Sequence, residues 1–168
     1  MELRAAEPSD LLTVLSWVSS RDECLMWGGP KIRYPATPET AWSDMEASKE
    51  NTYVLVDATL AGIGFGQVLP RCGKILHLAR LIVDPGLRGQ GIGRDLCIAL
   101  MNIGAARHHA DWFTLNVYES NEAAVKLYRS LEFEVKEQDD SGAVAMIQPL
   151  INASTLTDFS ANVPKPAG

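Results

Sequence analysis

Residues 83–93 read VDPGLRGQGIG, and this glycine-rich stretch decides how the rest of the chain is interpreted. A β-rich run precedes it, and a segment with helical periodicity follows it. Gly89, Gly91 and Gly93 carry no side chain, so the backbone there can approach a ligand closely. The first amides of the following helix would point at the same ligand, together with the positive end of the helix dipole. The stretch therefore predicts a binding site for a phosphate group.

Two other phosphate-binding glycine loops fit this stretch less well. A P-loop requires GxxxxGK followed by Ser or Thr, and no lysine occurs between Lys74 and Lys126. A dinucleotide fingerprint requires GxGxxG early in a βαβ unit, whereas this chain has GxGxG after several β-rich runs. A Rossmann-type nucleotide binder is therefore the least favoured of the functions considered below.

Length and composition favour a single soluble domain. The chain has 168 residues, of which 46% are hydrophobic and 21% charged, and its net charge is −6. The acidic balance disfavours nucleic acid and anionic membranes as partners and mildly favours amine substrates. The three cysteines are widely spaced without a CxxC pair, so we expect no metal site. Neither a signal core nor a run of about 20 apolar residues occurs, so we expect a cytoplasmic protein.

Hydrophobic periodicity predicts an α/β (α+β) domain. Helices are expected at residues 11–18, within 21–35, and at 37–49, 92–108 and 121–131. Strands are expected at residues 2–6, 53–57, 60–69, 74–83, 112–117, 133–137 and 143–147. The runs before the glycine loop predict an antiparallel meander, and the strand–helix–strand segment after it requires a parallel crossover. We expect one domain over 1–150, with a mixed, mostly antiparallel sheet of about seven strands flanked by helices, and a loosely ordered tail over 151–168.

A second motif lies downstream, in LNVYESNEAAVKLYRSLEFE over residues 115–134. An expected strand leads to Asn121, small residues follow, and Tyr128 comes seven positions later. Asn121 and Tyr128 are two helical turns apart, so they share a helix face and can address one ligand. A closing Phe133 completes the pattern.

The two motifs, in this order, resemble those of the GNAT acetyltransferase superfamily. Its pyrophosphate loop has Arg or Gln, two residues, Gly, one residue, and then Gly or Ala, which Arg88, Gly91 and Gly93 match. Val83 and Pro85 match the frequent exit of the preceding strand. The resemblance covers roughly residues 60–133 and implies a GNAT-like sheet that splays at the fourth and fifth strands.

The resemblance implies an N-acetyltransferase that moves the acetyl group of acetyl-CoA directly to a primary amine in a ternary complex. Loop amides would bind the pyrophosphate, main-chain groups of 81–83 would pair with the pantetheine arm, and Asn121 would hold the cofactor near its amide portion. Tyr128 would protonate the departing thiolate. The implied cofactor-binding residues are Leu81, Ile82, Val83, Arg88, Gly89, Gly91, Ile92, Gly93, Arg94, Asn121 and Tyr128.

His77 is the candidate catalytic base. It lies six residues before Val83, so strand periodicity places both on one face, and histidine titrates near neutrality. A structural role for a lone strand histidine stays open. Asn116 stands where N-terminal-alanine acetyltransferases of the superfamily often carry a glutamate base, which disfavours that substrate type. We assign Glu119 to a solvated loop, and His108 and His109 to helix capping.

The acceptor amine is not identified by the sequence. Selectivity would come from the N-terminal helices, where aromatic and apolar residues are expected to form a wall or to belong to the core: Trp17, Met26, Trp27 and Tyr34. A CoA-binding regulatory or interaction module without turnover is the alternative function. Dimers are common in the superfamily, so a homodimer stays an open expectation.

Two features predict unusual backbone. Gly62, Gly64 and Gly66 alternate along one strand, where they would admit a neighbouring backbone or a ligand, or mark a twisted or bulged strand. Glu132 stands at a helix exit where the superfamily usually has a glycine in the left-handed conformation. A residue with a side chain costs on the order of 1 kcal/mol there.

Overall fold

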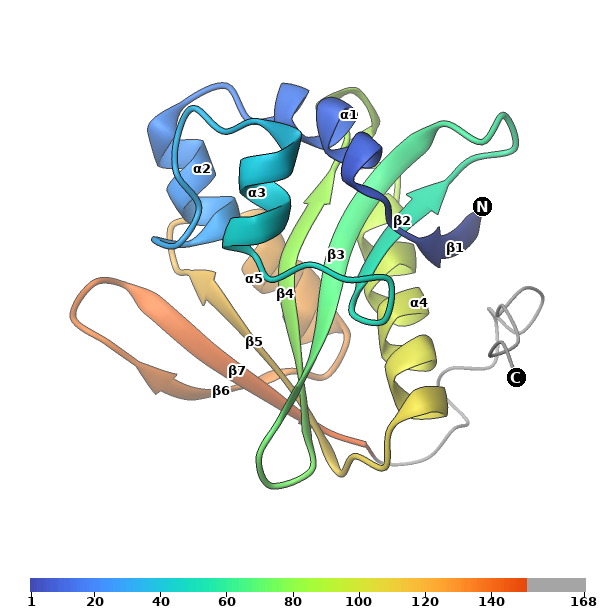
Figure 1. The fold of residues 1–168 in the computed structure, drawn as a ribbon. Coiled ribbons are helices and arrows are strands. Elements are labelled where there is room, and N and C mark those ends of the chain that lie inside the picture. Colours follow the sequence, from blue (N-terminus) through green and yellow to red (C-terminus); the bar gives the residue numbers. More distant parts are fainter. Residues whose placement is uncertain (151–168) are drawn as a thin grey trace.

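One seven-stranded sheet runs through the computed structural model, which describes residues 1–150, in the order β1-β2-β3-β4-β5-β7-β6 (Figure 1). The strands are β1 (Glu2–Ala5), β2 (Thr52–Val56), β3 (Gly62–Arg71), β4 (Ile75–Val83), β5 (Trp112–Tyr118), β6 (Glu134–Gln138) and β7 (Ala143–Pro149). All neighbouring pairs are antiparallel except β4 and β5, which are parallel. The expected mixed, mostly antiparallel sheet is confirmed. The tail expected over 151–168 lies outside the described residues.

Helices cover both faces of this sheet (Figure 1). One face carries α1 (Leu11–Ser16), α2 (Arg21–Gly28) and α3 (Pro38–Asp44), and the other carries α4 (Ile92–Arg107) and α5 (Glu122–Ser130). Short 3₁₀ turns lie at Pro8–Asp10, before α1, and at Pro85–Leu87, before the three glycines of residues 89–93. The helix expected over 37–49 is shorter than predicted, because the chain leaves the helical conformation at Glu46, whose φ is 51°.

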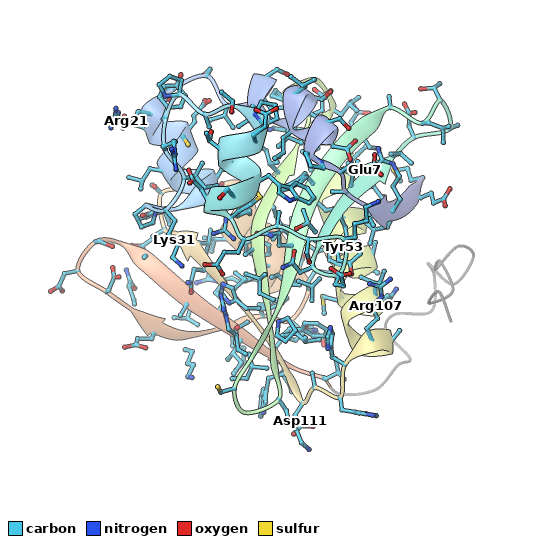
Figure 2. All side chains as sticks on the ribbon, in the orientation of Figure 1. Glu7, Arg21, Lys31, Tyr53, Arg107 and Asp111 are labelled. Atoms are coloured by element: carbon cyan, nitrogen blue, oxygen red, sulfur yellow. The ribbon has the colours of Figure 1, made fainter. Side chains whose placement is uncertain are left out.

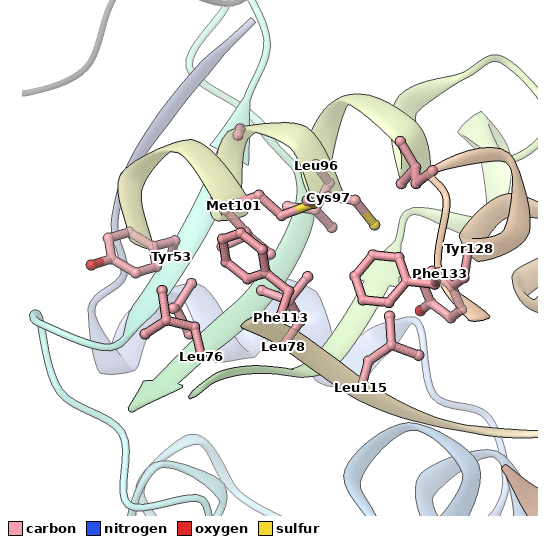
Figure 3. Packing of buried hydrophobic residues seen from close by; sticks show 14 of the residues in the cluster. Tyr53, Leu76, Leu78, Leu96, Cys97, Met101, Phe113, Leu115, Tyr128 and Phe133 are labelled. Atoms are coloured by element: carbon pink, nitrogen blue, oxygen red, sulfur yellow. The ribbon is translucent and has the colours of Figure 1, made fainter. Parts of the chain in front are cut away.

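The core between α4 and the sheet is the larger of two buried clusters. Figure 3 shows Leu76, Leu78 and Phe113 of the central strands packed against Leu96 and Met101 of α4. The far end of α4 is held by Arg107, which donates a 2.9 Å hydrogen bond to the Tyr53 hydroxyl and lies 5.7 Å from the ring centroid (Figure 2). The glycine loop therefore leads into a helix that is firmly packed on the sheet.

The strand glycines make room for α4. A Cβ atom added at Gly66 would lie 2.7 Å from Leu100 Cδ1, and one at Gly64 would lie 3.4 Å from Leu96 Cδ2. Of the alternatives left open for these glycines, a ligand contact is therefore wrong, since helix side chains occupy the space. The bulged strand is confirmed by the pairing of β3 with β2, where Leu55↔Gly64 and Val56↔Gly62 leave Ile63 as an extra residue in β3.

The splay predicted between the fourth and fifth strands is confirmed. β4 and β5 pair from Ile75↔Trp112 to Leu78↔Leu115 and then separate (Figure 1). Just beyond the last pair, Arg80 and Leu81 of β4 lie opposite the single residue Gly66 of β3, which makes a β-bulge. Arg80 has a φ of 54°, in the left-handed region. The bulge bends β4 at the point where the sheet opens.

Candidate active site

A cleft of about 870 Å³ occupies the opening between β4 and β5. Its walls come from β4, the glycine loop, the first turn of α4, one face of α5, and the ends of α1 and α2. All the residues predicted to bind the cofactor line this cleft except Ile92, whose side chain packs against the core. The fold thus brings together two motifs that are about 30 residues apart in the sequence. The individual roles of these residues stay predictions.

The glycine loop presents backbone to this cleft. Gly89 and Gly91 have φ values of 77° and 86°, and no atom lies within 4 Å of a Cβ added at either residue. Gly91 is the N-cap of α4, and its carbonyl accepts hydrogen bonds from the amides of Arg94 and Asp95. The amides of 91–93 have no acceptor within the helix that starts there. Those amides, the helix dipole and the guanidinium groups of Arg88 and Arg94 together favour an anion.

One edge of β4 is available to an extended ligand. β3 pairs with one side of the strand, through Val83↔Gly64 and Ile82↔Phe65. On the other side, the ladder with β5 ends at Leu78, and residues 81–83 line the cleft. A free strand edge of this kind pairs with an added extended chain.

Asn121 and Tyr128 both line the cleft from α5. Asn121 caps the helix, because its Oδ1 accepts a 3.2 Å hydrogen bond from the amide of Ala124 and leaves its Nδ2 group for a ligand. The Tyr128 ring packs edge-on against Phe133, with 6.1 Å between centroids (Figure 3). Burial raises the pKa of Tyr128, so its hydroxyl keeps its proton at neutral pH and can donate it.

The expectation that His77 and Val83 share a strand face is wrong. The bulge at Arg80 and Leu81 adds one residue to β4, and the side-chain alternation reverses across it. Leu76 and Leu78 before the bulge and Val83 after it all face α4. His77 therefore points to the opposite side of the sheet.

The surroundings of His77 give no support to a role as base. It is absent from the lining of the cleft, and its Nδ1 lies 3.0 Å from Oγ1 of Thr114 on β5. Burial, with smaller contributions from Arg71 and Arg80, lowers the pKa of His77 to about 4. The imidazole is therefore neutral at physiological pH and a weak proton acceptor. Its catalytic role stays an untested prediction.

Of the two alternatives for the aromatic and apolar residues of the N-terminal helices, both apply in part, because Trp17 belongs to the buried core and also lines the cleft. Trp17, Met26 and Trp27 line the cleft, whereas Tyr34 does not and donates a hydrogen bond to the carbonyl of Ser19. Trp27 fixes α2 over the sheet, because its Nε1 donates a 2.8 Å hydrogen bond to the carbonyl of Arg80.

A smaller chamber of about 60 Å³ extends from this region between β4 and β5. It shares Trp27, Asn121 and Tyr128 with the main cleft and adds Arg80 and Asn116. Arg80 was not among the residues predicted from the sequence. The signal that could have singled it out is a charged residue inside the apolar run KILHLARLIV, residues 74–83.

The remaining polar candidates lie outside the cleft. Glu119 is exposed and accepts a hydrogen bond from Gln138, and His108 is the C-cap residue of α4. Among residues 1–150, no three His, Cys, Asp or Glu side chains gather as metal ligands would. Within that same part of the chain, no helix has the length and apolar character needed to cross a membrane.

Comparisons with known proteins agree with this architecture. A family model described as "Acetyltransferase (GNAT) family" matches residues 15–133. The "Peptidyl-lysine N-acetyltransferase YjaB" of Escherichia coli is 34% identical over 76 residues, which are 45% of this chain and 48% of that protein. The "N-acetyltransferase 9-like protein" of Nematostella vectensis is 31% identical over 92 residues, which are 52% of this chain and 45% of that one. The matches span less than half the length of these relatives.

A solved structure shares the fold at low identity. The spermidine N-acetyltransferase from Vibrio cholerae, in complex with CoA and spermine, has a TM-score of 0.71 and 18% sequence identity, and the match covers 88% of this chain and 94% of that one.

Proposed function

The chain belongs to the GNAT family of acetyltransferases, and from that premise we propose that it transfers the acetyl group of acetyl-CoA to the nitrogen of a primary amine. The observation that carries the proposal is the cleft between β4 and β5. There a glycine loop, a free strand edge and a buried tyrosine converge. The volume of about 870 Å³ lies within the range typical of small-molecule and cofactor sites.

The residues present suit acetyl-CoA. The amides of 91–93 and the side chains of Arg88 and Arg94 would hold the pyrophosphate at the start of α4. The main chain of Leu81, Ile82 and Val83 would pair with the pantetheine arm. The Nδ2 group of Asn121 would donate a hydrogen bond to an amide carbonyl of that arm. When bound, acetyl-CoA supplies a thioester carbonyl that an amine can attack.

Tyr128 has the position and the protonation state for a general acid. The new C–N bond forms as the amine attacks, the C–S bond breaks, and the sulfur leaves as a thiolate that takes the Tyr128 proton. The proton released by the acceptor nitrogen restores the phenol through solvent. General-acid assistance of this kind contributes about 10²- to 10⁴-fold to rate. Retention of a buried tyrosine at this point favours turnover over a purely binding role.

The identity of the base is a separate question. His77 stays the predicted group, although its side chain faces away from the cleft. His77→Gln would keep a polar partner for Thr114 and remove the titrating ring. An unchanged pH profile of kcat/KM in this variant rejects His77 as the base and leaves a water molecule to accept the proton.

Two measurements test the proposed function. Acetyl-CoA should raise the unfolding midpoint while NAD and ATP do not, since a ligand at 100 times its Kd adds about 2.7 kcal/mol of stability. Thiol release from acetyl-CoA should then appear with at least one member of a panel of amines, amino acids and peptides. Stabilisation without release across the panel would favour the CoA-binding regulatory module. The absence of stabilisation would reject both.

A further inference from the structure

We infer that the acceptor carries a carboxylate close to its amine and that Arg80 binds this carboxylate in the chamber beside Tyr128. The inference rests on the proposed function, because the chamber borders the place where the amine would attack. It names the class of acceptor, which the family membership leaves open.

The bulge in β4 directs the Arg80 side chain. With a φ of 54°, this residue departs from the strand and turns its guanidinium toward Gln67 of β3. Nη1 of Arg80 donates a 2.5 Å hydrogen bond to Oε1 of Gln67. Gln67 is itself completely buried, and its Nε2 donates a 2.9 Å hydrogen bond to Oγ1 of Thr52. One arm of the guanidinium is thus held by a fixed neutral partner.

The charge of Arg80 has no matching anion. Its Nε atom is buried without a hydrogen-bond partner, and no carboxylate in residues 1–150 forms an ion pair with it. Burial and the neighbouring Arg71 both lower the pKa of Arg80, whereas only the exposed Glu46 raises it. Arg80 is half-buried as a residue, and its Nε is the part of the guanidinium removed from water, so that N–H group has neither a protein partner nor solvent to bind. The folded chain therefore lacks a partner that a bound anion would supply.

The chamber is suited to one small anionic group. Its volume of about 60 Å³ is enough for a group as small as a carboxylate. Asn116 and Tyr118 are polar residues of the lining, and no acidic residue lies among its walls. The acidic residues Glu23 and Glu122 line only the larger cleft. Arginine is the side chain best matched to a carboxylate, because it can donate two parallel hydrogen bonds.

The position of the chamber sets where the carboxylate lies relative to the amine. Trp27, Leu81 and Tyr128 border both the chamber and the main cleft. An acceptor anchored at Arg80 would thus present its amine to the thioester beside Tyr128. An acceptor with a second positive charge in that place would be repelled by the guanidinium. The local cation, rather than the net charge of −6, would set the preference.

The experiment compares matched acceptors in wild type and two variants. Each α-amino acid in a panel is paired with its carboxamide and its decarboxylated amine, and kcat/KM is measured by thiol release. Wild type should prefer the carboxylate by about 10- to 100-fold, the range of one charge-assisted hydrogen-bonded contact. Arg80→Met should remove that preference, while kcat/KM for the carboxamide and the decarboxylated amine should stay within about threefold of the wild-type values. Arg80→Lys should retain part of the preference. Arg71→Met removes the nearby exposed charge outside the chamber and should leave the preference intact.

Each other result overturns the inference. Equal kcat/KM of wild type for the carboxylate and its amide, or a preference for dicationic amines, contradicts it without any variant. If Arg80→Met lowers kcat/KM equally for all acceptors, Arg80 acts on the thioester or on folding and does not bind the acceptor carboxylate.

A different result would reject the proposed function: stabilisation by acetyl-CoA without thiol release from any acceptor. In that case the carboxylate site can still be tested by measuring binding. In the presence of CoA, the amino acids of the panel should raise the unfolding midpoint of wild type but not of Arg80→Met. Equal shifts, or none, in the two proteins reject the site.

Discussion

The two walls of the cleft differ in the groups that they offer to the proposed ligands. The donor wall, which comprises the glycine loop at residues 88–94, the edge of β4 at 81–83 and the start of α5, offers mainly backbone groups from continuous stretches. The acceptor wall, which comprises Trp17, Met26, Trp27, Arg80 and Asn116, offers side chains from α1, α2, β4 and β5. Backbone recognition suits a donor shared across a family, whereas in the proposed reaction the side chains would set the choice of acceptor. The two walls should therefore respond differently to mutation.

Tyr128 lies where both walls meet and should show the largest effect. Tyr128→Phe removes the proton for the leaving sulfur, so kcat should fall by about 10²- to 10⁴-fold. The Kd for acetyl-CoA should stay within about threefold, because the ring and its packing on Phe133 remain. Steady-state kinetics and calorimetry measure the two quantities. Tyr34→Phe, outside the cleft, is the matched control. Unchanged turnover in Tyr128→Phe would remove this residue as the acid.

His77 belongs to neither wall and should affect stability. Its folded-state pKa of about 4 lies below the ordinary 6.5, so the unfolded chain binds more protons between these values. The stabilisation is fully present above pH 6.5 and is lost as the pH falls toward 4, on the order of 2–3 kcal/mol. Denaturant unfolding of wild type and His77→Gln across this range measures the difference. If both proteins lose stability equally on acidification, the titration of His77 is not the cause.

Gly91 tests the donor wall alone. Gly91→Ala places a side chain at a φ of 86° and at the mouth of the anion site, so the affinity for acetyl-CoA should fall about 10-fold. Gly73→Ala is a matched control, because Gly73 has a φ of 73°, equally open surroundings and a position outside the cleft. Both variants should lose about 1 kcal/mol of stability. Only Gly91→Ala should weaken acetyl-CoA binding in a calorimetric titration, and equal affinities would contradict a backbone cradle at the loop.

Glu132 should give the smallest effect. Its φ of 66° confirms the left-handed conformation expected where the superfamily usually has glycine. Glu132→Gly should therefore raise the free energy of unfolding by up to about 1 kcal/mol without changing kcat/KM, since the residue lies outside the cleft. A loss of stability on this change would mean that the Glu132 side chain makes a compensating contact.

The elements with strong local signals were predicted well. Three β-rich runs correspond to β2, β3 and β4, and β2 is a continuous apolar run because helices cover both faces of the sheet. One long amphipathic segment corresponds to α4, because burial of one helix face imposes a helical period on the sequence. The end of α3 was missed, since the left-handed Glu46 that terminates it carries no glycine or proline signal. The grouping of Asn121 and Tyr128 with the glycine loop could be expected from the order of the motifs, and the cleft joins them.

The donor wall was determined by the sequence itself, because glycine spacing and helix periodicity act within short stretches of chain and specify backbone geometry locally. Only the tertiary structure decided which side chains line the cleft and the chamber. One extra residue at Arg80 reverses the alternation of β4, which turns His77 away from the cleft and places the half-buried Arg80 in the chamber that Tyr128 also lines. The bulge depends on the pairing of β4 with Gly66, where Leu100 of α4 leaves no room for a side chain, and on the separation of β4 from β5. These are contacts between distant segments, and no local pattern in residues 74–83 records them.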